Sequence, residues 1–328
     1  MSRTVLVTGA AGFIGSHLAE ALLKRSDTVV ALDNFNDYYS PARKRANLLE
    51  VRAAIADPEA FRFFEGDIRD RELVERLFRE QRPDAVVHLA AMAGVRSSRE
   101  RPLLYCDVNL SGTLNLLQAA ALVAEPRPTF VFASTSSVYG RDSAVPFTES
   151  QTCDRPLAPY PATKRAGEIL GYSYHHLYGL DLTSLRFFTV YGPRNRPDMM
   201  PHLVLDNIFF GADVPLFNAG DMKRDWTYVD DIVSGVLAAV DRPLGYRVLN
   251  LGRGEPVHLR DFIEEVEGCA GKKAVLRPEP MDSADVQVTW ADISLARELL
   301  GYRPRTSVDD GVRAFWQWYR KARLNQQA

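Results

Sequence analysis

The sequence predicts an α/β protein with a Rossmann-like, doubly wound parallel sheet and a smaller C-terminal lobe. Short apolar runs rich in Val and Phe recur through the first half of the chain, without alternating polar residues. Such runs are typical of strands buried on both faces, and the helical segments between them favour crossover connections. The 328 residues also exceed a typical single domain, which favours a second lobe.

The expected strands start with TVLVTG, directly after the N-terminus. In chain order we expect strands at 4–9, 28–33, 61–67, 85–91 and 129–135, with two more at 182–188 and 246–252. Between them, helices are expected at 16–25, 70–81 and 108–123. After Tyr191 the chain becomes irregular and proline-rich. We expect the second lobe mainly from about 193–225 and 253–305, while 226–252 returns a strand and a helix to the sheet.

Composition excludes several classes of protein. Forty basic against 42 acidic residues leave a formal charge of −2, so no global field favours nucleic acid or an anionic membrane. No apolar stretch has the length of a signal peptide or a membrane span, and we expect a cytoplasmic protein. The cysteines Cys106, Cys153 and Cys269 lack metal-ligand spacing, so we expect reduced thiols and no metal site.

A dinucleotide site is predicted at the first turn. Gly9, Gly12 and Gly15 follow the first strand and open the first helix, where glycines permit a tight turn and bring backbone amides close to a pyrophosphate. Asp33 ends the second strand eighteen positions after Gly15, as expected for an acid that binds a ribose hydroxyl. Its charge would repel a 2′-phosphate, so we predict NAD and not NADP. Asp67, at the end of the third expected strand, is a candidate for the adenine amino group.

The segment YPATK indicates acid/base chemistry. Tyr160 and Lys164 lie one turn apart on an expected helix that follows the strand ending in STSSVYG. A free tyrosine is a poor base at neutral pH because its pKa is near 10. A neighbouring ammonium and a positive nicotinamide ring would favour the phenolate and lower that pKa. Five residues alone fit an ordinary exposed helix turn equally well.

The motifs TGAAGFIG, GDI, HLAA, STSSVYG and YPATK, in this order, resemble the extended short-chain dehydrogenase/reductase family over nearly the whole chain. The resemblance implies that Tyr160 is the acid/base, that Lys164 holds the nicotinamide ribose, and that Thr135 shares the substrate hydroxyl. It implies an NAD-binding domain at 1–192, joined by 226–252, and a nucleotide-sugar lobe mainly at 193–328. The cofactor residues would be Gly9, Gly12, Phe13, Ile14, Gly15, Asp33, Asn34, Asp67, Ile68, Leu89, Ala90, Ala91, Tyr160 and Lys164.

The residues before VYG select among the reactions of this family. Its nucleotide-sugar enzymes oxidise carbon 4 of the sugar with NAD, and the 4,6-dehydratases then use an Asp-Glu pair where this chain has Ser136 and Ser137. Uronate decarboxylases likewise usually keep a Glu at the position of Ser137. Without a carboxylate, return of the hydride to the opposite face of the keto sugar is the remaining outcome, which is a 4-epimerisation.

The substrate is indicated by three further segments. FFTVYGPRNRPDM, MKRDWTYVDDI and AGVRSS closely resemble the corresponding segments of UDP-glucuronate 4-epimerases, which interconvert UDP-glucuronate and UDP-galacturonate with tightly bound NAD. An arginine fork matches a carboxylate, so we expect Arg196 at the uronate, with Thr189 as hydroxyl donor. The implied substrate residues are Arg96, Ser136, Ser137, Thr189, Arg196, Pro215, Phe217, Arg224 and Asp285.

The nucleotide end carries alternatives. The resemblance places Arg224 on the pyrophosphate and Pro215 and Phe217 beside the uracil, while Arg96 serves the diphosphate or the carboxylate. Equally, Arg224 can pair with Asp221 or Asp225, and PLF can be lobe core. The chain departs from the family at MDSADVQVTWAD, which keeps Asp285 but loses a proline and a glycine. Asp282 stands where UDP-galactose 4-epimerases place a phosphate-binding arginine. This departure bears on the shape of the nucleotide pocket.

Other functions stay open. The chain can be an epimerase for UDP-glucose or a UDP-N-acetylhexosamine, a nucleotide-sugar dehydratase or decarboxylase, or a redox sensor that binds NAD without catalysis. The apolar helix at 108–123 and the helix with YPATK resemble a pair that forms a four-helix homodimer interface in relatives. The alternative is that both helices only pack on their own sheet.

Overall fold

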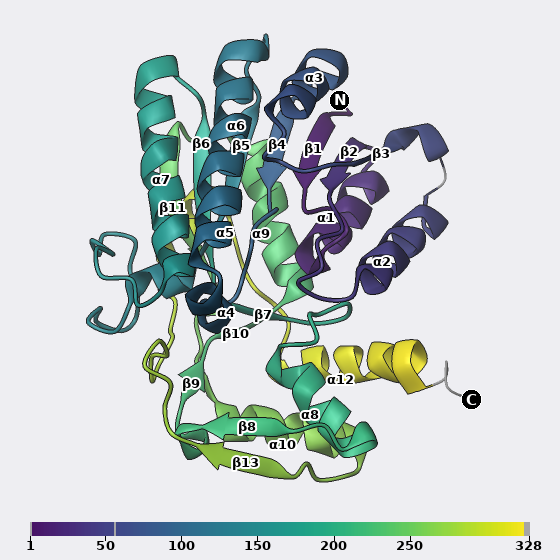
Figure 1. The fold of residues 1–328 in the computed structure, drawn as a ribbon, viewed down its shortest axis with the longest axis vertical. Helices are drawn as coiled ribbons and strands as arrows, with labels where there is room; N and C mark the ends of the chain where they lie inside the picture. Colours follow the sequence, from purple (N-terminus) through teal and green to yellow (C-terminus); the bar gives the residue numbers. More distant parts are fainter. Residues whose placement is uncertain (1, 56, 325–328) are drawn as a thin grey trace.

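The centre of the protein is a seven-stranded sheet in which every neighbouring pair is parallel (Figure 1). The structure is a computed structural model that describes residues 2–55 and 57–324. In spatial order the strands are β11 (Tyr246–Leu251), β6 (Leu182–Phe187), β5 (Thr129–Thr135), β4 (Ala85–His88), β1 (Thr4–Thr8), β2 (Thr28–Asp33) and β3 (Phe61–Glu65). All seven strands predicted from apolar runs lie in this sheet, so the doubly wound fold is confirmed.

Helices cover both faces of the sheet because neighbouring strand residues point to opposite sides. Val5 and Val7 belong to one buried cluster and Leu6 to the other. The first cluster includes α1 (Phe13–Lys24), α9 (Val229–Asp241) and α11 (Ser294–Leu300). The second includes α3 (Arg71–Gln81), a continuous run of α5 (Pro102–Cys106), η2 (Asp107–Gly112), α6 (Thr113–Gln118) and η3 (Ala119–Val123), and α7 (Pro159–Tyr178). The helix expected at 108–123 is thus the later part of a longer run.

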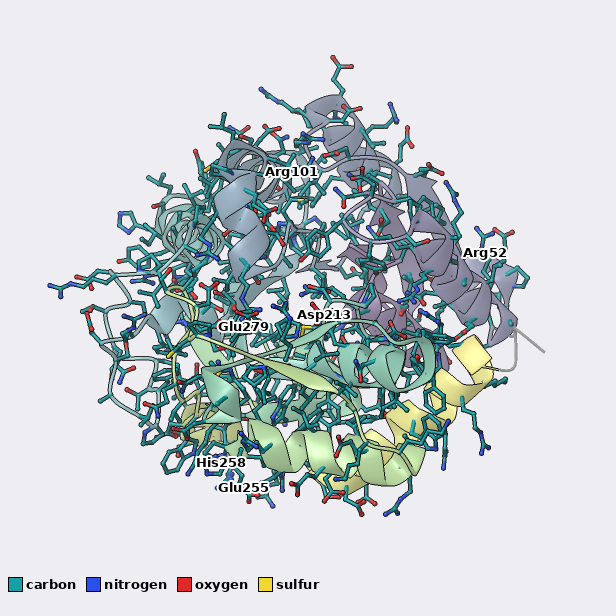
Figure 2. All side chains as sticks on the ribbon, turned by 60° about the horizontal axis from the view of Figure 1, so that its bottom comes forward. Arg52, Arg101, Asp213, Glu255, His258 and Glu279 are labelled. Atoms are coloured by element: carbon teal, nitrogen blue, oxygen red, sulfur yellow. The ribbon has the colours of Figure 1, made fainter. Side chains whose placement is uncertain are left out.

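A second group of elements lies below the sheet in Figure 1. It contains the parallel pair β8 (Val214–Phe217) and β13 (Leu276–Glu279), with α8 (Met200–Phe210), α10 (Leu259–Ala270) and α12 (Val308–Tyr319). A short antiparallel pair, β9 (Lys223–Arg224) and β12 (Val257–His258), adjoins them. Figure 2 turns this part forward and places Glu255 and His258 at its lower edge, away from Arg101 and Arg52.

The segment 226–252 divides between the two parts. Its helix α9 packs on the sheet face beside α1, and its strand β11 forms the sheet edge next to β6. Its first residues instead form β10 (Trp226–Tyr228), which pairs with β7 (Thr189–Tyr191) outside the main sheet. The Trp226 ring stacks on Phe262 of α10 with centroids 3.8 Å apart, which ties β10 to the lower group.

The site lies where the chain reverses the direction in which it adds strands. From β1 the chain proceeds to β2 and β3 on one side, and then returns to β4, β5 and β6 on the other. Ligands of doubly wound folds bind in the crevice at the carboxyl ends of the strands at this point. The neighbouring connections here are α2 (Pro41–Ala53), α4 (Val95–Glu100) and η4 (Ser136–Tyr139). Within the described residues, no helix combines the length and apolarity needed to cross a membrane.

Candidate active site

The glycine loop is packed so closely that side chains do not fit. Gly9 has a φ of +71°, and a Cβ there would lie 2.8 Å from the Ala90 nitrogen. A Cβ on Gly15 would lie 2.1 Å from the Gly9 carbonyl oxygen. Helix α1 begins with Gly12 as N-cap and has no side-chain cap, so its first amides are not capped from within the loop. This geometry suits a pyrophosphate at the helix N-terminus.

Asp33 is buried at the end of β2 and is held by the same loop. Its carboxylate accepts hydrogen bonds from the Ala11 nitrogen at 3.0 Å and the Phe35 nitrogen at 2.9 Å. Burial raises the pKa of Asp33, and the charge of Lys44 opposes this. Lys44 donates to the Asn36 carbonyl at 2.6 Å. It lies on α2, a helix that the sequence pattern did not predict, and so it was not recognised as a site residue.

Asp67 follows β3, and its carboxylate already accepts several hydrogen bonds. It accepts from Asn34 Nδ2 at 2.8 Å, from the Arg69 nitrogen at 2.8 Å, and from the Arg69 guanidinium at 2.9 and 3.0 Å. Burial acts to raise the pKa of Asp67, but Arg69 and Asn34 hold it below its ordinary value. Arg69 also bonds Asp107 at 2.7 Å, so an adenine amino group at Asp67 would share the carboxylate with this arginine.

Tyr160 and Lys164 both face the carboxyl end of the sheet from the start of α7. The Lys164 ammonium donates to the Ala133 carbonyl at 2.7 Å. Burial lowers the pKa of Lys164 to about 7, and Glu168 acts in the opposite direction. Burial also raises the pKa of Tyr160, while the Arg196 charge and the Thr135 hydroxyl act to lower it. In the protein alone Arg196 is the cation that acts on the phenol, and the effect of Lys164 together with a bound nicotinamide on the Tyr160 pKa stays a prediction.

Thr135 closes β5 and begins η4. Its hydroxyl accepts from the Ser137 nitrogen at 3.2 Å and donates to Ser137 Oγ at 3.3 Å. Ser136 and Ser137 are partly buried in the first turn of η4. Two hydroxyls, and no carboxylate, therefore stand directly after the strand that carries Thr135.

One cavity joins the glycine loop to α7. All fourteen residues predicted to bind the cofactor line it, from Gly9 through to Lys164, together with Arg196. The side chains Asn36, Tyr38, Tyr39 and Lys44 also line it, and the sequence motifs did not indicate them. The other predicted substrate residues and Thr135 are not part of this lining.

Arg196, in the loop after β7, is held by an acidic neighbour. Its Nε and Nη2 atoms donate to the two carboxylate oxygens of Asp198, each at 3.0 Å. The Tyr38 hydroxyl donates to the same carboxylate at 3.0 Å. Thr189 is partly buried in β7, and its backbone nitrogen donates to the Asp225 carbonyl at 3.1 Å. Arg196 thus reaches the cavity with one edge of its fork already paired.

The nucleotide-end residues form a second group, around β8. The Arg96 guanidinium carbon lies 3.8 Å from the centroid of the Phe217 ring, and its Nη2 donates to Asp285 at 2.6 Å. Pro215 and Phe217 share the half-buried face of β8. In this structure Arg96 therefore covers the aromatic face that was assigned to a uracil.

Arg224 lies near this group without an acidic partner. Its Nη1 donates only to the backbone carbonyls of Lys223 and Gln287, at 2.9 and 3.2 Å. In the part of the chain that the structure describes, it forms no ion pair. Burial lowers the pKa of Arg224, and Asp285 opposes this. The alternative pairing with Asp225 is wrong, because that carboxylate accepts from the backbone nitrogens of three other residues, Arg253, Gly254 and Ala291.

The turn at 282–285 is held by hydrogen bonds and ion pairs to arginines, two of which the motifs did not indicate. Arg99 bonds Asp282 at 2.7 Å, and Arg141 donates to the Ser283 carbonyl at 2.7 Å. With the Arg96–Asp285 pair, three arginines from the sheet part of the chain hold this turn. No local sequence signal marks contacts between residues so far apart in the chain.

Comparisons with known proteins agree with this geometry. A family profile described as GDP-mannose 4,6-dehydratase matches residues 6–315. A UDP-glucuronate 4-epimerase of Thermodesulfobacterium geofontis is 43% identical over 95% of each chain, and UDP-glucuronate 4-epimerase 4 of Arabidopsis thaliana is 45% identical over 96% of this chain and 75% of that protein. The crystal structure of UDP-glucuronic acid 4-epimerase from Bacillus cereus with UDP-glucuronic acid and NAD is 36% identical, with a TM-score of 0.89 over 97% of this chain and 99% of that one.

Proposed function

Because the chain belongs to the extended short-chain dehydrogenase/reductase family of NAD-dependent nucleotide-sugar epimerases and dehydratases, we propose that it is a UDP-glucuronate 4-epimerase. The observation that carries this proposal is the single cavity that joins the glycine loop, Tyr160, Lys164 and Arg196. It brings a dinucleotide cradle, an acid/base pair and a carboxylate-binding cation to one place. The relatives at 42–45% identity named as UDP-glucuronate 4-epimerases support the same substrate.

The cavity fits NAD. A Cβ at Gly9 or Gly15 would fill the space in which a pyrophosphate approaches the backbone, and the carboxylate of Asp33 suits a ribose and opposes a 2′-phosphate. Lys164 would hold the nicotinamide ribose. When bound, NAD supplies the chemistry of accepting a hydride from carbon 4 and returning it. Since every catalytic cycle would restore the oxidised form, we expect the cofactor to stay bound.

Tyr160 is the proposed acid/base. As phenolate it would remove the proton of the carbon 4 hydroxyl, directly or through Thr135, and it would give the proton back after the keto sugar has turned. Arg196 and Lys164 line the same cavity; the charge of Arg196 favours the phenolate in the protein alone, and the Lys164 ammonium would add to this beside a bound nicotinamide. Ser136 and Ser137 offer no carboxylate for the elimination of water, which opposes the dehydratase alternative.

The uronate carboxylate is assigned to Arg196 and Thr189. The 4-keto intermediate of a uronate is a β-keto acid that can lose carbon dioxide. An arginine held in place by Asp198 would bind the carboxylate in one orientation and so suppress this loss. At the other end of the substrate, the partly buried Arg224, which forms no ion pair among the described residues, is the proposed diphosphate ligand, with Pro215 and Phe217 beside the uracil once Arg96 leaves the ring.

The proposal also covers the domain boundaries, the oligomeric state and the cellular compartment. We assign 1–192 with 226–252 to the NAD-binding domain and mainly 193–328 to the nucleotide-sugar lobe. A homodimer would bury apolar side chains that are exposed on the adjacent helices α5 to η3 and α7, namely Leu103, Leu114, Leu122, Ile169, Tyr172 and Leu177. Free thiols, with Cys106 exposed, suit the reducing cytoplasm.

Proton NMR of UDP-glucuronate with the purified protein and no added cofactor tests the proposal. New anomeric signals of UDP-galacturonate are the expected result, and they would also show that NAD copurifies. Turnover of UDP-glucose alone would overturn the uronate assignment and the role of Arg196. A pentose signal would instead mean that decarboxylation dominates, while a signal from a keto sugar would favour a dehydratase.

A further inference from the structure

A buried charged cluster lies directly behind the active site, and none of the proposed catalytic steps uses it. Glu168 on α7 is fully buried. Its carboxylate accepts from Arg186 of β6 at 2.9 and 2.8 Å, from Ser134 Oγ of β5 at 2.6 Å, and from Arg165 at 2.8 Å. Arg186 is 1% exposed and also lies 4.7 Å from the Tyr139 ring. A fully buried carboxylate with this many donors requires an explanation.

The cluster is connected to both catalytic elements. Glu168 follows Lys164 by four residues and therefore lies one turn further along the same face of α7. Ser134, its partner on β5, stands between Ala133, whose carbonyl accepts from Lys164, and Thr135. The strand segment that carries the catalytic hydroxyl is thus bonded at consecutive residues to the helix that carries Tyr160 and Lys164.

The helix has little freedom to move independently of these bonds. A Cβ added to Gly167 would lie 2.5 Å from the Phe132 ring, and one on Gly171 would lie 2.8 Å from Leu182 Cδ2. Both glycines therefore bring α7 into close contact with β5 and β6. In such contact, a shift of Glu168 relative to Arg186 displaces Lys164 relative to Thr135.

The charges around Lys164 give Glu168 a second role. Arg186 on β6 and Arg165 on α7 are cations, as is Arg196 in the loop after β7. His88 on β4 is bonded to Thr8 and Thr113, and burial, followed by the charge of Lys164, holds its pKa well below the ordinary value. Among the described residues, Glu168 supplies the negative charge that opposes the effect of burial on Lys164.

We propose that Glu168 is a positioning residue of this active site, which fixes α7 against β5 and β6 and keeps the Lys164 side chain in the ammonium form. The ammonium, unlike the neutral amine, carries a charge that favours a phenolate at Tyr160, and it donates more strongly to a ribose hydroxyl. This role rests on the proposed epimerase activity for its catalytic consequence, but the protonation of Lys164 can be measured without any substrate.

The test compares Glu168→Gln with the matched control Glu267→Gln. Glu267 is a buried carboxylate on α10 that bonds Lys273 and the Ala274 nitrogen, far from α7 in the chain. Lysine ε-carbons are labelled with ¹³C, and the Lys164 signal, assigned with Lys164→Arg, is titrated by NMR. Removing Glu168 should lower the pKa of Lys164 by about one pH unit, while Glu267→Gln should leave it in place. An unchanged titration in Glu168→Gln would overturn the proposal.

Activity gives the second readout. The alkaline limb of the kcat profile at saturating UDP-sugar should move to lower pH in Glu168→Gln by the same amount, and Glu168→Asp should restore part of it. If Glu168→Gln does not fold, Glu168→Gln/Arg186→Met removes both buried charges; because the two charges act on Lys164 in opposite directions, the double variant should show a smaller shift in the same direction. Wild-type turnover with unshifted variant profiles would contradict the role of Glu168 alone. Absence of turnover with every UDP-sugar would contradict the proposed function, and the NMR titration would still decide the role of Glu168.

Discussion

At the scale of single residues, the arginines near the cavity differ in whether a carboxylate pairs with them. Arg196 and Arg96 are paired with Asp198 and Asp285, so binding a substrate anion must compete with an internal carboxylate. Arg224 is partly buried, donates to two backbone carbonyls and to the Met222 sulfur, and forms no ion pair among the described residues. A partly buried charge without a counter-charge costs folding free energy, which favours a ligand that supplies the missing anion.

Replacing Arg224 with methionine should therefore separate stability from function. The Lys223 and Gln287 carbonyls keep other donors, the nitrogens of Thr289 and Lys223, so little hydrogen bonding is lost. We expect the melting temperature to stay the same or rise, because the desolvation cost disappears. KM for UDP-sugars should rise about a hundredfold, since truncating a buried charge partner of a ligand costs roughly 2–5 kcal/mol. Thermal melts and steady-state kinetics check this. The control is Arg277→Met, which removes an exposed arginine that is ion-paired with Asp213. A large loss of stability with normal KM would assign Arg224 to the lobe core.

At the scale of elements, α7 is set by its glycine contacts as much as by its catalytic side chains. Gly167→Ala would place a methyl group 2.5 Å from the Phe132 ring. Overpacking of this kind destabilises by about 1–3 kcal/mol, and a displaced helix should lower kcat at least tenfold through misplacement of Tyr160. Urea denaturation and kinetics check both values. On the exposed face of α10, Gly268→Ala meets nothing within 4 Å and should stabilise by about 0.5–1 kcal/mol. Equal effects of the two substitutions would contradict the packing account.

The elements also show what a single sequence can and cannot predict. Buried parallel strands such as β1 and β5 were predictable because burial on both faces leaves continuous apolar runs. The glycines at the first turn and the Tyr160–Lys164 pair were predictable because local backbone geometry dictates their spacing. Helix α2 was missed because Pro41–Ala53 is rich in charged and polar residues and has only a weak apolar stripe. The site residue Lys44 was missed with it.

At the scale of the whole molecule, the two groups of elements are joined by contacts that sequence patterns do not record. Arg96 and Arg99 come from the helix after β4, and Arg141 from the segment after η4, yet all three bond the turn at 282–285. Such contacts follow from the tertiary arrangement alone. The loss of a proline and a glycine in this turn, noted from the sequence, coincides with the segment that these arginines hold.

These contacts predict a salt-sensitive closure of the lobe on the cofactor cavity. Asp282 bonds Arg99 at 2.7 Å and lies 3.6 Å from Arg96 Nε, so Asp282→Asn weakens two links between the two parts at once. Partly exposed ion pairs contribute only about 0–1 kcal/mol each, so the melting temperature should change little. KM for the UDP-sugar should nevertheless rise severalfold, because binding must then supply the closure that the pairs provide, whereas kcat at saturation should persist. Raising the ionic strength from about 0.01 to 0.15 M should increase the wild-type KM more than that of Asp282→Asn, since screening weakens the ion pairs that the variant already lacks.

Asp309→Asn, whose partner Arg313 lies within the same helix, is the matched control and should behave like the wild type. Identical salt dependence in wild type and Asp282→Asn would show that the turn is held by packing and that its arginines are not the link between the lobes.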